Sequence, residues 1–295
     1  MESATQPVTG CFTRIFRHDP LEHSKPSIRL ILLLPDLWGA PDPSSPILVN
    51  GQLFSVRQNL LDFLDMARQN QAAATTYWID ALCIDQGNIL ERNHQVAQMG
   101  DIYSRATCVY AWLGATTNDQ DMIPALRVLR DPEIASPQQW GLVSAAKRDL
   151  EDYICRNPYW ERAWIVQEIF LARNVLVWLD TTTIPFEYLH WAVDYFYLSW
   201  KGLPFTRFNL SNRDIPDPKN LISKFEVAKQ MYHGASLPAL LGRFSGMKCE
   251  HARDHVFSLL SLCNEGHQFP VDYGSSDRTF FIETLKHCCA SSCLC

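Results

Sequence analysis

The chain has 295 residues, of which 47% are hydrophobic and 20% are charged, as is usual for a globular protein with a sizeable core. Its net charge is −6 and it has no basic block, which argues against a protein that binds nucleic-acid backbones. No signal-peptide pattern opens the chain, and apolar runs such as residues 30–34 are too short to cross a bilayer. With ten cysteines at irregular spacings, the sequence predicts a cytoplasmic protein with reduced thiols and no membrane span.

The first part of the chain predicts an arm, two strand regions and a helix. Residues 1–26 are polar and are interpreted as an N-terminal arm. The apolar run 28–34 is typical of a strand in the buried middle of a parallel sheet. Asn-Gly between two apolar runs predicts a hairpin over 47–56, and apolar residues three and four apart predict a helix over 56–69.

Residues 77–114 form the stretch around which the rest is organised. A short aromatic and β-branched strand at 76–79 is followed by a polar turn. A helix with one apolar face then begins at Ile89, and a second strand covers 107–113. A strand, helix and strand of this length predict a parallel βαβ crossover.

Beyond this unit the pattern is mostly helical. It predicts one further strand at 175–179, a polar linker at 201–220, and free thiols in a frayed tail that holds Cys288, Cys289, Cys293 and Cys295. The predicted helical segments are 122–129, 142–153, 160–172, 185–199 and 221–262.

Three sequence blocks resemble a known family. WIDALCIDQ (78–86), the block at 91–106 and YWERAWIVQE (159–168) are similar to conserved blocks of the fungal heterokaryon-incompatibility (HET) domain. The resemblance implies a HET domain at 27–180 and a mostly helical extension at 181–295 with a Cys-rich tail. HARDHVFSLLSL (251–262) in that extension resembles an element found downstream of HET domains.

The resemblance extends remotely to Toll/interleukin-1-receptor (TIR) domains, through the spacing of Trp164 and Glu168. It implies an α/β, TIR-like (flavodoxin-like) three-layer domain with a mainly parallel sheet. It also implies an effector of fungal non-self recognition and programmed cell death that cleaves the nicotinamide–ribose bond of NAD. In this reading NAD is a substrate and no cofactor is bound. The alternative is a non-catalytic module that passes on a death signal by self-association or by contact with a sensor protein.

Candidate site residues follow from topology and helical periodicity. Ligands of open parallel sheets bind beyond the carboxyl ends of the strands. Glu168, beside an aromatic stripe on its helix, is expected to be desolvated with a raised pKa, which suits general acid–base work or stabilisation of a developing sugar cation. By resemblance it is the central catalytic residue that Asp80 assists, and the structural alternative is a helix-surface Glu packed beside a structural Trp. The predicted substrate-binding residues are Asp36, Trp38, Cys83, Asp85, Gln86, Trp112 and Trp164.

Structural roles compete with several of these assignments. Asp80 is equally suited to hold ribose and to cap a helix, whereas Asp85 is the better candidate for the cap of the helix that follows. Cys83 is more typical of a buried thiol than of a nucleophile. Arg92 and Arg162 more often pair with carboxylates or stack on aromatic rings than bind phosphates. No metal site is predicted, because His251 and His255 have no clear third ligand.

One block departs from the family pattern. HET domains carry a Leu-Ser-Tyr-x-Trp-Gly type block after the first strand, whereas Leu34 is followed here by Pro35 and Asp36. The change removes hydroxyl donors and stiffens the turn. If the turn contacts substrate, activity is expected to be altered or lost.

Overall fold

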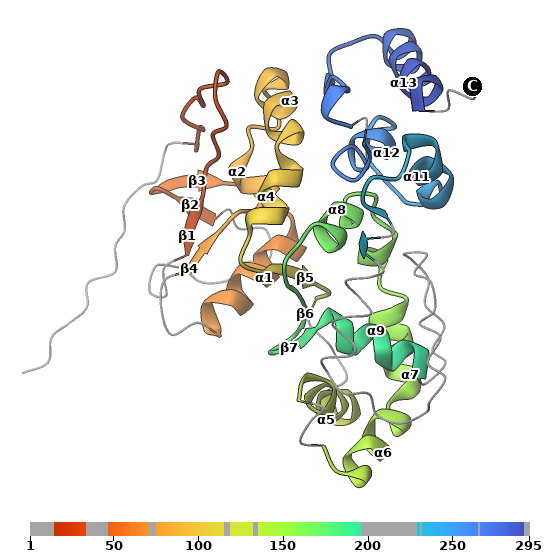
Figure 1. The fold of residues 1–295 in the computed structure, drawn as a ribbon. Coiled ribbons are helices and arrows are strands. Elements are labelled where there is room, and N and C mark those ends of the chain that lie inside the picture. The colour runs from red at the N-terminus through yellow and green to blue at the C-terminus, as the bar shows by residue number, and fades with distance from the viewer. Residues whose placement is uncertain are drawn as a thin grey trace, which may run out of the picture. The chain divides into compact units, whose positions relative to one another are not determined.

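The computed structural model describes residues 15–33, 47–70, 75–114, 119–131, 135–195, 229–230, 232–264 and 266–291 (Figure 1). These residues form a mixed α/β structure of small sheets and helices. The chain divides into two compact units, Met1–Gln86 and Gly87–Cys295. The predicted residues Pro35, Asp36 and Trp38, the linker 201–220, and Cys293 and Cys295 lie outside the described residues.

The first unit contains two small antiparallel sheets. Strand β1 (Ile31–Leu33) pairs with β4 (Thr75–Tyr77), and β2 (Ile47–Val49) pairs with β3 (Gln52–Phe54). The 28–34 run was predicted to be a strand buried inside a parallel sheet, and this is wrong: β1 has three residues, and Leu32 is 57% exposed. With a single antiparallel partner, this strand has no second layer to bury both of its faces.

The predicted hairpin is confirmed. Asn50 and Gly51 connect β2 to β3 with φ angles of 51° and 73°. Two consecutive residues with positive φ are what a two-residue type I′ turn requires, and Asn-Gly tolerates them best. The helix predicted after the hairpin is α1 (Gln58–Gln69), which buries Phe63, Leu64 and Ala67.

The described end of the N-terminal arm is attached to the hairpin. The backbone of Phe16 donates a hydrogen bond to the Leu53 carbonyl oxygen at 2.9 Å. The ring centroid of Phe16 lies 5.5 Å from that of Phe54 and 5.0 Å from that of His18. His18 Nε2 is 2.9 Å from the carbonyl oxygen of Leu82 in the short helix α2 (Asp80–Cys83). The arm therefore contributes side chains to the folded unit.

The sheet of the second unit has the order β5–β6–β7 (Figure 1). Strand β5 (Val109–Trp112) is parallel to β6 (Val175–Leu179), and β6 is antiparallel to β7 (Thr182–Pro185). Strand β6 matches its prediction, whereas β7 was not predicted. The predicted parallel βαβ crossover from 76–79 to 107–113 is wrong, because β4 pairs with β1 and β5 pairs with β6. Among the named strands of the described residues, only the β5–β6 pair is parallel, so the sheet is not mainly parallel.

Helices make up most of the second unit. The helix predicted to begin at Ile89 is two helices that meet at Gln98. The helix predicted over 160–172 is a 3₁₀ turn at Pro158–Glu161 followed by α8 (Ile165–Phe170), because Arg162 is extended. The other helices are α3 (Ile89–Ala97), α4 (Met99–Arg105), α5 (Asp119–Arg130), α6 (Pro137–Ala145), α7 (Lys147–Asp149), a π-helix (Leu150–Cys155), α9 (Phe186–Tyr195), α11 (Leu237–Phe244), α12 (Asp254–Phe257), a 3₁₀ turn (Gly266–Gln268) and α13 (Asp277–Ser291). Cys288 and Cys289 belong to α13, so the prediction of a frayed tail is wrong for these two residues.

The segment after α12 returns to α3. The Asn93 side chain donates from Nδ2 to Asp272 Oδ1 at 3.2 Å and accepts from the Tyr273 backbone at 2.9 Å. The Arg92 guanidinium lies 3.7 Å from the centroid of the Tyr273 ring, so it stacks on an aromatic residue, one of the two structural roles predicted for it. The chain that follows the downstream element resembling that of HET proteins thus packs against a helix from the central sequence block.

Gly100 in α4 marks a second close contact with the downstream element. A Cβ atom at this position would lie 2.3 Å from Ser261 Oγ and 2.4 Å from Ser261 Cβ. We expect Gly100→Ala to lower the free energy of unfolding by about 1–3 kcal/mol through overpacking, although alanine is the better helix former. The midpoint and slope of urea unfolding of the full chain measure this change.

Two further variants test the close contact between Gly100 and Ser261. Adding Ser261→Gly to Gly100→Ala should restore most of the lost stability, because it removes both clashing atoms. Gly141→Ala in α6 is the matched control: no atom lies within 4 Å of the added carbon, so this change should stabilise by about 0.5–1 kcal/mol. A Gly100→Ala variant as stable as Gly141→Ala would contradict the close packing.

Candidate functional site

The predicted site residues fall in two groups, one in each compact unit. Asp80, Cys83, Asp85 and Gln86 belong to Met1–Gln86, whereas Trp112, Trp164 and Glu168 belong to Gly87–Cys295. The prediction that Asp80 assists Glu168 therefore concerns residues of different units and stays a prediction.

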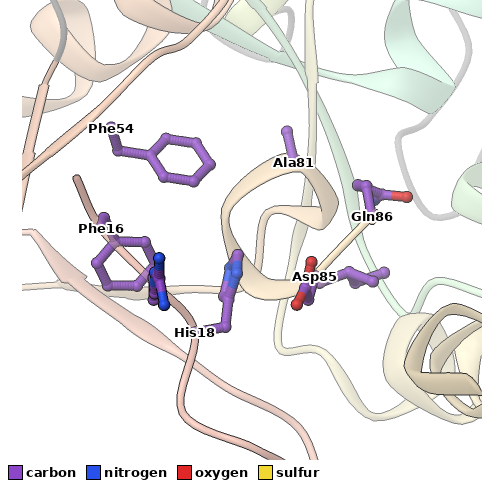
Figure 2. A pocket seen from close by; sticks show the side chains of 8 residues that line it. Phe16, His18, Phe54, Ala81, Asp85 and Gln86 are labelled. Carbon is purple, nitrogen blue, oxygen red and sulfur yellow. The ribbon is translucent and has the colours of Figure 1, made fainter. Parts of the chain in front are cut away.

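In the first unit, Asp85 and Gln86 line a cavity of about 400 Å³ together with residues of the arm. Figure 2 shows the side chains of His18 and Asp85 at this cavity, with the rings of Phe16 and Phe54 beside them. Its lining residues are Phe16, Arg17, His18, Phe54, Ala81, Ile84, Asp85 and Gln86. The cavity combines an aromatic wall with a carboxylate, an amide, an imidazole and a guanidinium, a mixture that suits a small polar ligand.

Besides Ala81 and Ile84, sequence reasoning missed the four residues of this cavity that lie outside the block 78–86, namely Phe16, Arg17, His18 and Phe54. Three of them precede the first strand in a stretch interpreted only as an arm, and the fourth ends the hairpin. No local pattern connects residues 16–18 with Gln86. Their proximity depends on the pairing of the arm with β3 and on the contact of His18 with Leu82.

Asp80 and Asp85 were each weighed as a ligand and as a helix cap. Asp80 begins the short helix α2, and its Oδ1 accepts a hydrogen bond from the Ala81 backbone at 2.7 Å. The prediction that Asp85 caps the next helix is wrong, because the N-cap of α3 is Asn88, whose side chain accepts from the Glu91 backbone at 3.2 Å. Asn88 followed three residues later by Glu91 is a sequence signal that could have identified this cap.

Cys83 is fully buried, and burial raises the pKa of its thiol to about 11. At neutral pH the Cys83 side chain is therefore almost entirely in its protonated thiol form. This environment agrees with the structural role that its sequence context favours. Among the described residues, seven cysteines carry free thiols. No group of three or more His, Cys, Asp or Glu side chains within the described ranges is placed to hold a metal ion.

In the second unit, Glu168 forms a cluster with Tyr159 and Arg162. Glu168 is only 8% exposed, and the Tyr159 hydroxyl donates to its Oε2 atom at 2.5 Å. Arg162 Nη2 lies 3.9 Å from Glu168 Oε1, and the guanidinium also lies 5.6 Å from the Tyr159 ring centroid. Arg162 therefore pairs with a carboxylate and stacks on an aromatic ring, as its structural role predicted.

The electrostatics of this cluster keep Tyr159 protonated. Burial, followed by the negative charge of Glu168, raises the pKa of Tyr159 well above its usual value. The phenol therefore remains a hydrogen-bond donor at physiological pH and orients the carboxylate from one side, while Arg162 approaches from the other. A carboxylate held in this way can stabilise a nearby positive charge or accept a proton. The Glu168 carboxylate can instead have a structural role alone, in which it holds the turn before α8 in place.

The two tryptophans predicted for the substrate pocket have different environments. Trp164 is half-buried and is the N-cap residue of α8, one turn from Glu168. Trp112 is 8% exposed and lies opposite Trp178 in the β5–β6 register, with ring centroids 6.1 Å apart. Most of the Trp112 surface is therefore occupied by packing within the sheet.

The family comparison covers the central blocks of the sequence. Residues 36–168 match the model of the family described as heterokaryon incompatibility protein (HET). The chain is 44% identical over 46 residues to heterokaryon incompatibility protein 6, OR allele, of Neurospora crassa. That match spans 16% of this chain and 7% of the relative. No solved structure matches the chain. None of the described helices is long and apolar enough to span a membrane.

Proposed function

Because the chain carries a HET domain over residues 36–168, we propose that it acts as an effector of fungal heterokaryon incompatibility. In this role the fusion of genetically different hyphae triggers programmed cell death. The family match supports the proposal, and the relative with the 46-residue match is itself named a heterokaryon incompatibility protein.

The chemical step we propose is hydrolysis of the N-glycosidic bond of NAD. The bond between nicotinamide and ribose breaks with its electron pair on nicotinamide, and the ribosyl carbon develops positive charge. Glu168 stabilises that charge and accepts a proton from the water molecule that adds to the carbon, so the products are nicotinamide and ADP-ribose. The observation that supports this role is the buried carboxylate of Glu168, held between a phenol and a guanidinium.

The other residues of the proposed site have supporting roles. Tyr159 and Arg162 position Glu168, and Trp164 supplies an aromatic surface one turn away. The assisting role of Asp80 and the substrate-binding roles of Asp36, Trp38, Asp85 and Gln86 stay predictions from the sequence. Cys83 and Trp112 are buried, so each contributes packing within its own unit rather than an exposed contact surface.

Glu168→Gln tests the catalytic role directly. Glutamine keeps the size of the side chain and an oxygen that can accept from Tyr159, but it cannot stabilise a cation through a full negative charge. We expect nicotinamide release by concentrated protein incubated with NAD to fall at least about 100-fold, as is usual for loss of a general acid–base group. Toxicity in fungal cells should fall with it.

Glu161→Gln is the matched control for this experiment. Glu161 lies in the same sequence block, is bonded through Oε2 to Lys248 at 2.5 Å, and does not contact Glu168 in the described contacts. It should keep both activities. Undiminished nicotinamide release or toxicity in a folded Glu168→Gln variant would refute the catalytic proposal.

A non-catalytic signalling module is the second candidate, and one observation favours it. Glu168 lines neither the cavity at Asp85 nor the cavity at Phe170 and Arg173, and its oxygens already face Tyr159 and Arg162. If the protein acts in this way, it releases no nicotinamide at any concentration, while Glu168→Gln remains toxic. Self-association of the purified chain, measured by sedimentation, would then be the property to follow.

A further inference from the structure

A second cavity, of about 440 Å³, lies at the carboxyl end of α8 in the unit Gly87–Cys295. Its walls come from the end of that helix and from a segment about 60 residues further along the chain. The lining residues are Phe170, Leu171, Ala172, Arg173, Lys229, Gln230 and His233. Apart from Arg173, these residues lie in the predicted helices 160–172 and 221–262, and none of them was predicted to belong to a site.

The polar lining of this cavity is basic. Arg173 and Lys229 carry positive charges and His233 adds an imidazole, whereas no carboxylate belongs to the lining that the described residues provide. The protein as a whole has a net charge of −6, so this described lining of basic and neutral groups departs from the average surface. A cleft whose charged groups share one sign concentrates the positive potential within it.

Two of these basic groups are held in place by backbone oxygens. Lys229 is only 5% exposed, and its Nζ donates to the Ala172 carbonyl oxygen at 2.8 Å. Arg173 donates from Nε to the Ser104 carbonyl oxygen at 3.0 Å, which fixes the plane of the guanidinium. Within the described residues, the two terminal nitrogens of Arg173 and the ring of His233 make no hydrogen bond. Donors fixed before binding lose less conformational entropy when a ligand arrives.

From this arrangement we infer that the cavity binds the phosphate group of a small molecule. The terminal nitrogens of Arg173 match the spacing of two phosphate oxygens, while Lys229 supplies a second positive charge. Its volume is within the range of small-molecule sites. Leu171 adds an apolar wall on which the organic part of a phosphate ester, such as a nucleotide base, can pack. The site is separate from the proposed nicotinamide cleavage and does not depend on it.

Calorimetric titration of the full-length chain tests this inference. The probes are inorganic phosphate and AMP, each at constant ionic strength and with chloride as the reference anion. We expect a dissociation constant of about 1 mM or tighter for at least one probe, corresponding to about 4 kcal/mol. Tighter binding of AMP than of phosphate would identify a nucleotide as the ligand, and equal binding would identify the phosphate group alone as the determinant.

Arg173 and His233 are exposed, so a variant that changes both residues should fold normally. Arg173→Ala combined with His233→Ala leaves the buried Lys229 in place and should weaken binding at least about 10-fold. Arg105→Ala is the matched control, because Arg105 is an exposed residue next to Ser104 that does not line the cavity; it should bind as the unchanged protein does. Absence of binding by the unchanged protein up to about 10 mM would overturn the inference. Equal binding by the double variant would overturn it as well.

Discussion

Replacing Arg253 with alanine is expected to lower the free energy of unfolding of the protein by about 2–4 kcal/mol, because several oxygens of one segment lose a charged hydrogen-bond donor at once. The Arg253 side chain is 11% exposed. Its Nη1 donates to the Asp272 carbonyl oxygen at 2.7 Å and to Ser275 Oγ at 3.0 Å, while Nη2 contacts Asp277 Oδ1 at 3.0 Å. The guanidinium also lies 5.2 Å from the Phe280 ring centroid. One side chain thus connects α12 to the chain that leads into α13.

Chemical denaturation and hydrogen exchange measure this effect. Exchange should accelerate most at residues 272–280, because alanine leaves backbone oxygens of this segment without their donor. Arg253→Lys should recover only part of the loss, since an ammonium cannot reproduce the planar fork of donors. Arg278→Ala is the control on α13: Arg278 is exposed, and this change should cost no more than about 0.5 kcal/mol. A cost that small for Arg253→Ala would show that the network contributes little.

Acidification is expected to remove about 3 kcal/mol of stability through one residue, His190. It lies in α9 and is 3% exposed, and burial lowers its pKa from the ordinary value of 6.5 to about 4. Between these two values the unfolded state binds a proton that the folded state does not, so stability rises with pH in this window. The contribution is therefore fully present above pH 6.5 and is lost as pH falls towards 4. Each pKa unit corresponds to about 1.4 kcal/mol.

The pH dependence of two variants isolates this contribution. His190→Leu cannot titrate, so the difference in unfolding free energy between pH 7 and pH 4 should be smaller than in the unchanged protein by about 3 kcal/mol. Absolute stability is not the measure, because leucine also changes the packing beside Phe186. His267→Gln, which replaces an exposed histidine, is the control for the effect of a histidine substitution in itself. Parallel profiles for His190→Leu and the unchanged protein would refute the prediction.

Elements whose signals are local were predictable from the sequence. The hairpin was one, because positive φ at Asn50 and Gly51 is a property of those two residues. Strand β6 and helices α1 and α5 were also predictable, because the positions of their apolar residues show which side chains are buried. The match to the HET family model was also predictable, since it rests on blocks of sequence within residues 36–168.

Contacts between distant segments were not predictable in the same way. The alternation of apolar residues shows that a strand exists but not which strand it joins, so β4 was assigned to β5 although it pairs with β1. Residues 16–18 of the arm line the cavity at Asp85, and no sequence pattern predicts that they lie close to Asp85. The partnership of Tyr159 with Glu168 also crosses a break in the predicted helix at Arg162.

The sequence by itself determined the hairpin turn, several helices and the match to the HET family model, because these depend on backbone preferences and on residues adjacent in the chain. Only the tertiary structure decided strand pairing, the partners of Glu168 and the basic lining at Arg173 and Lys229. Those features depend on the free energy of packing segments far apart in the chain, and many pairings satisfy the same local pattern of apolar and polar residues.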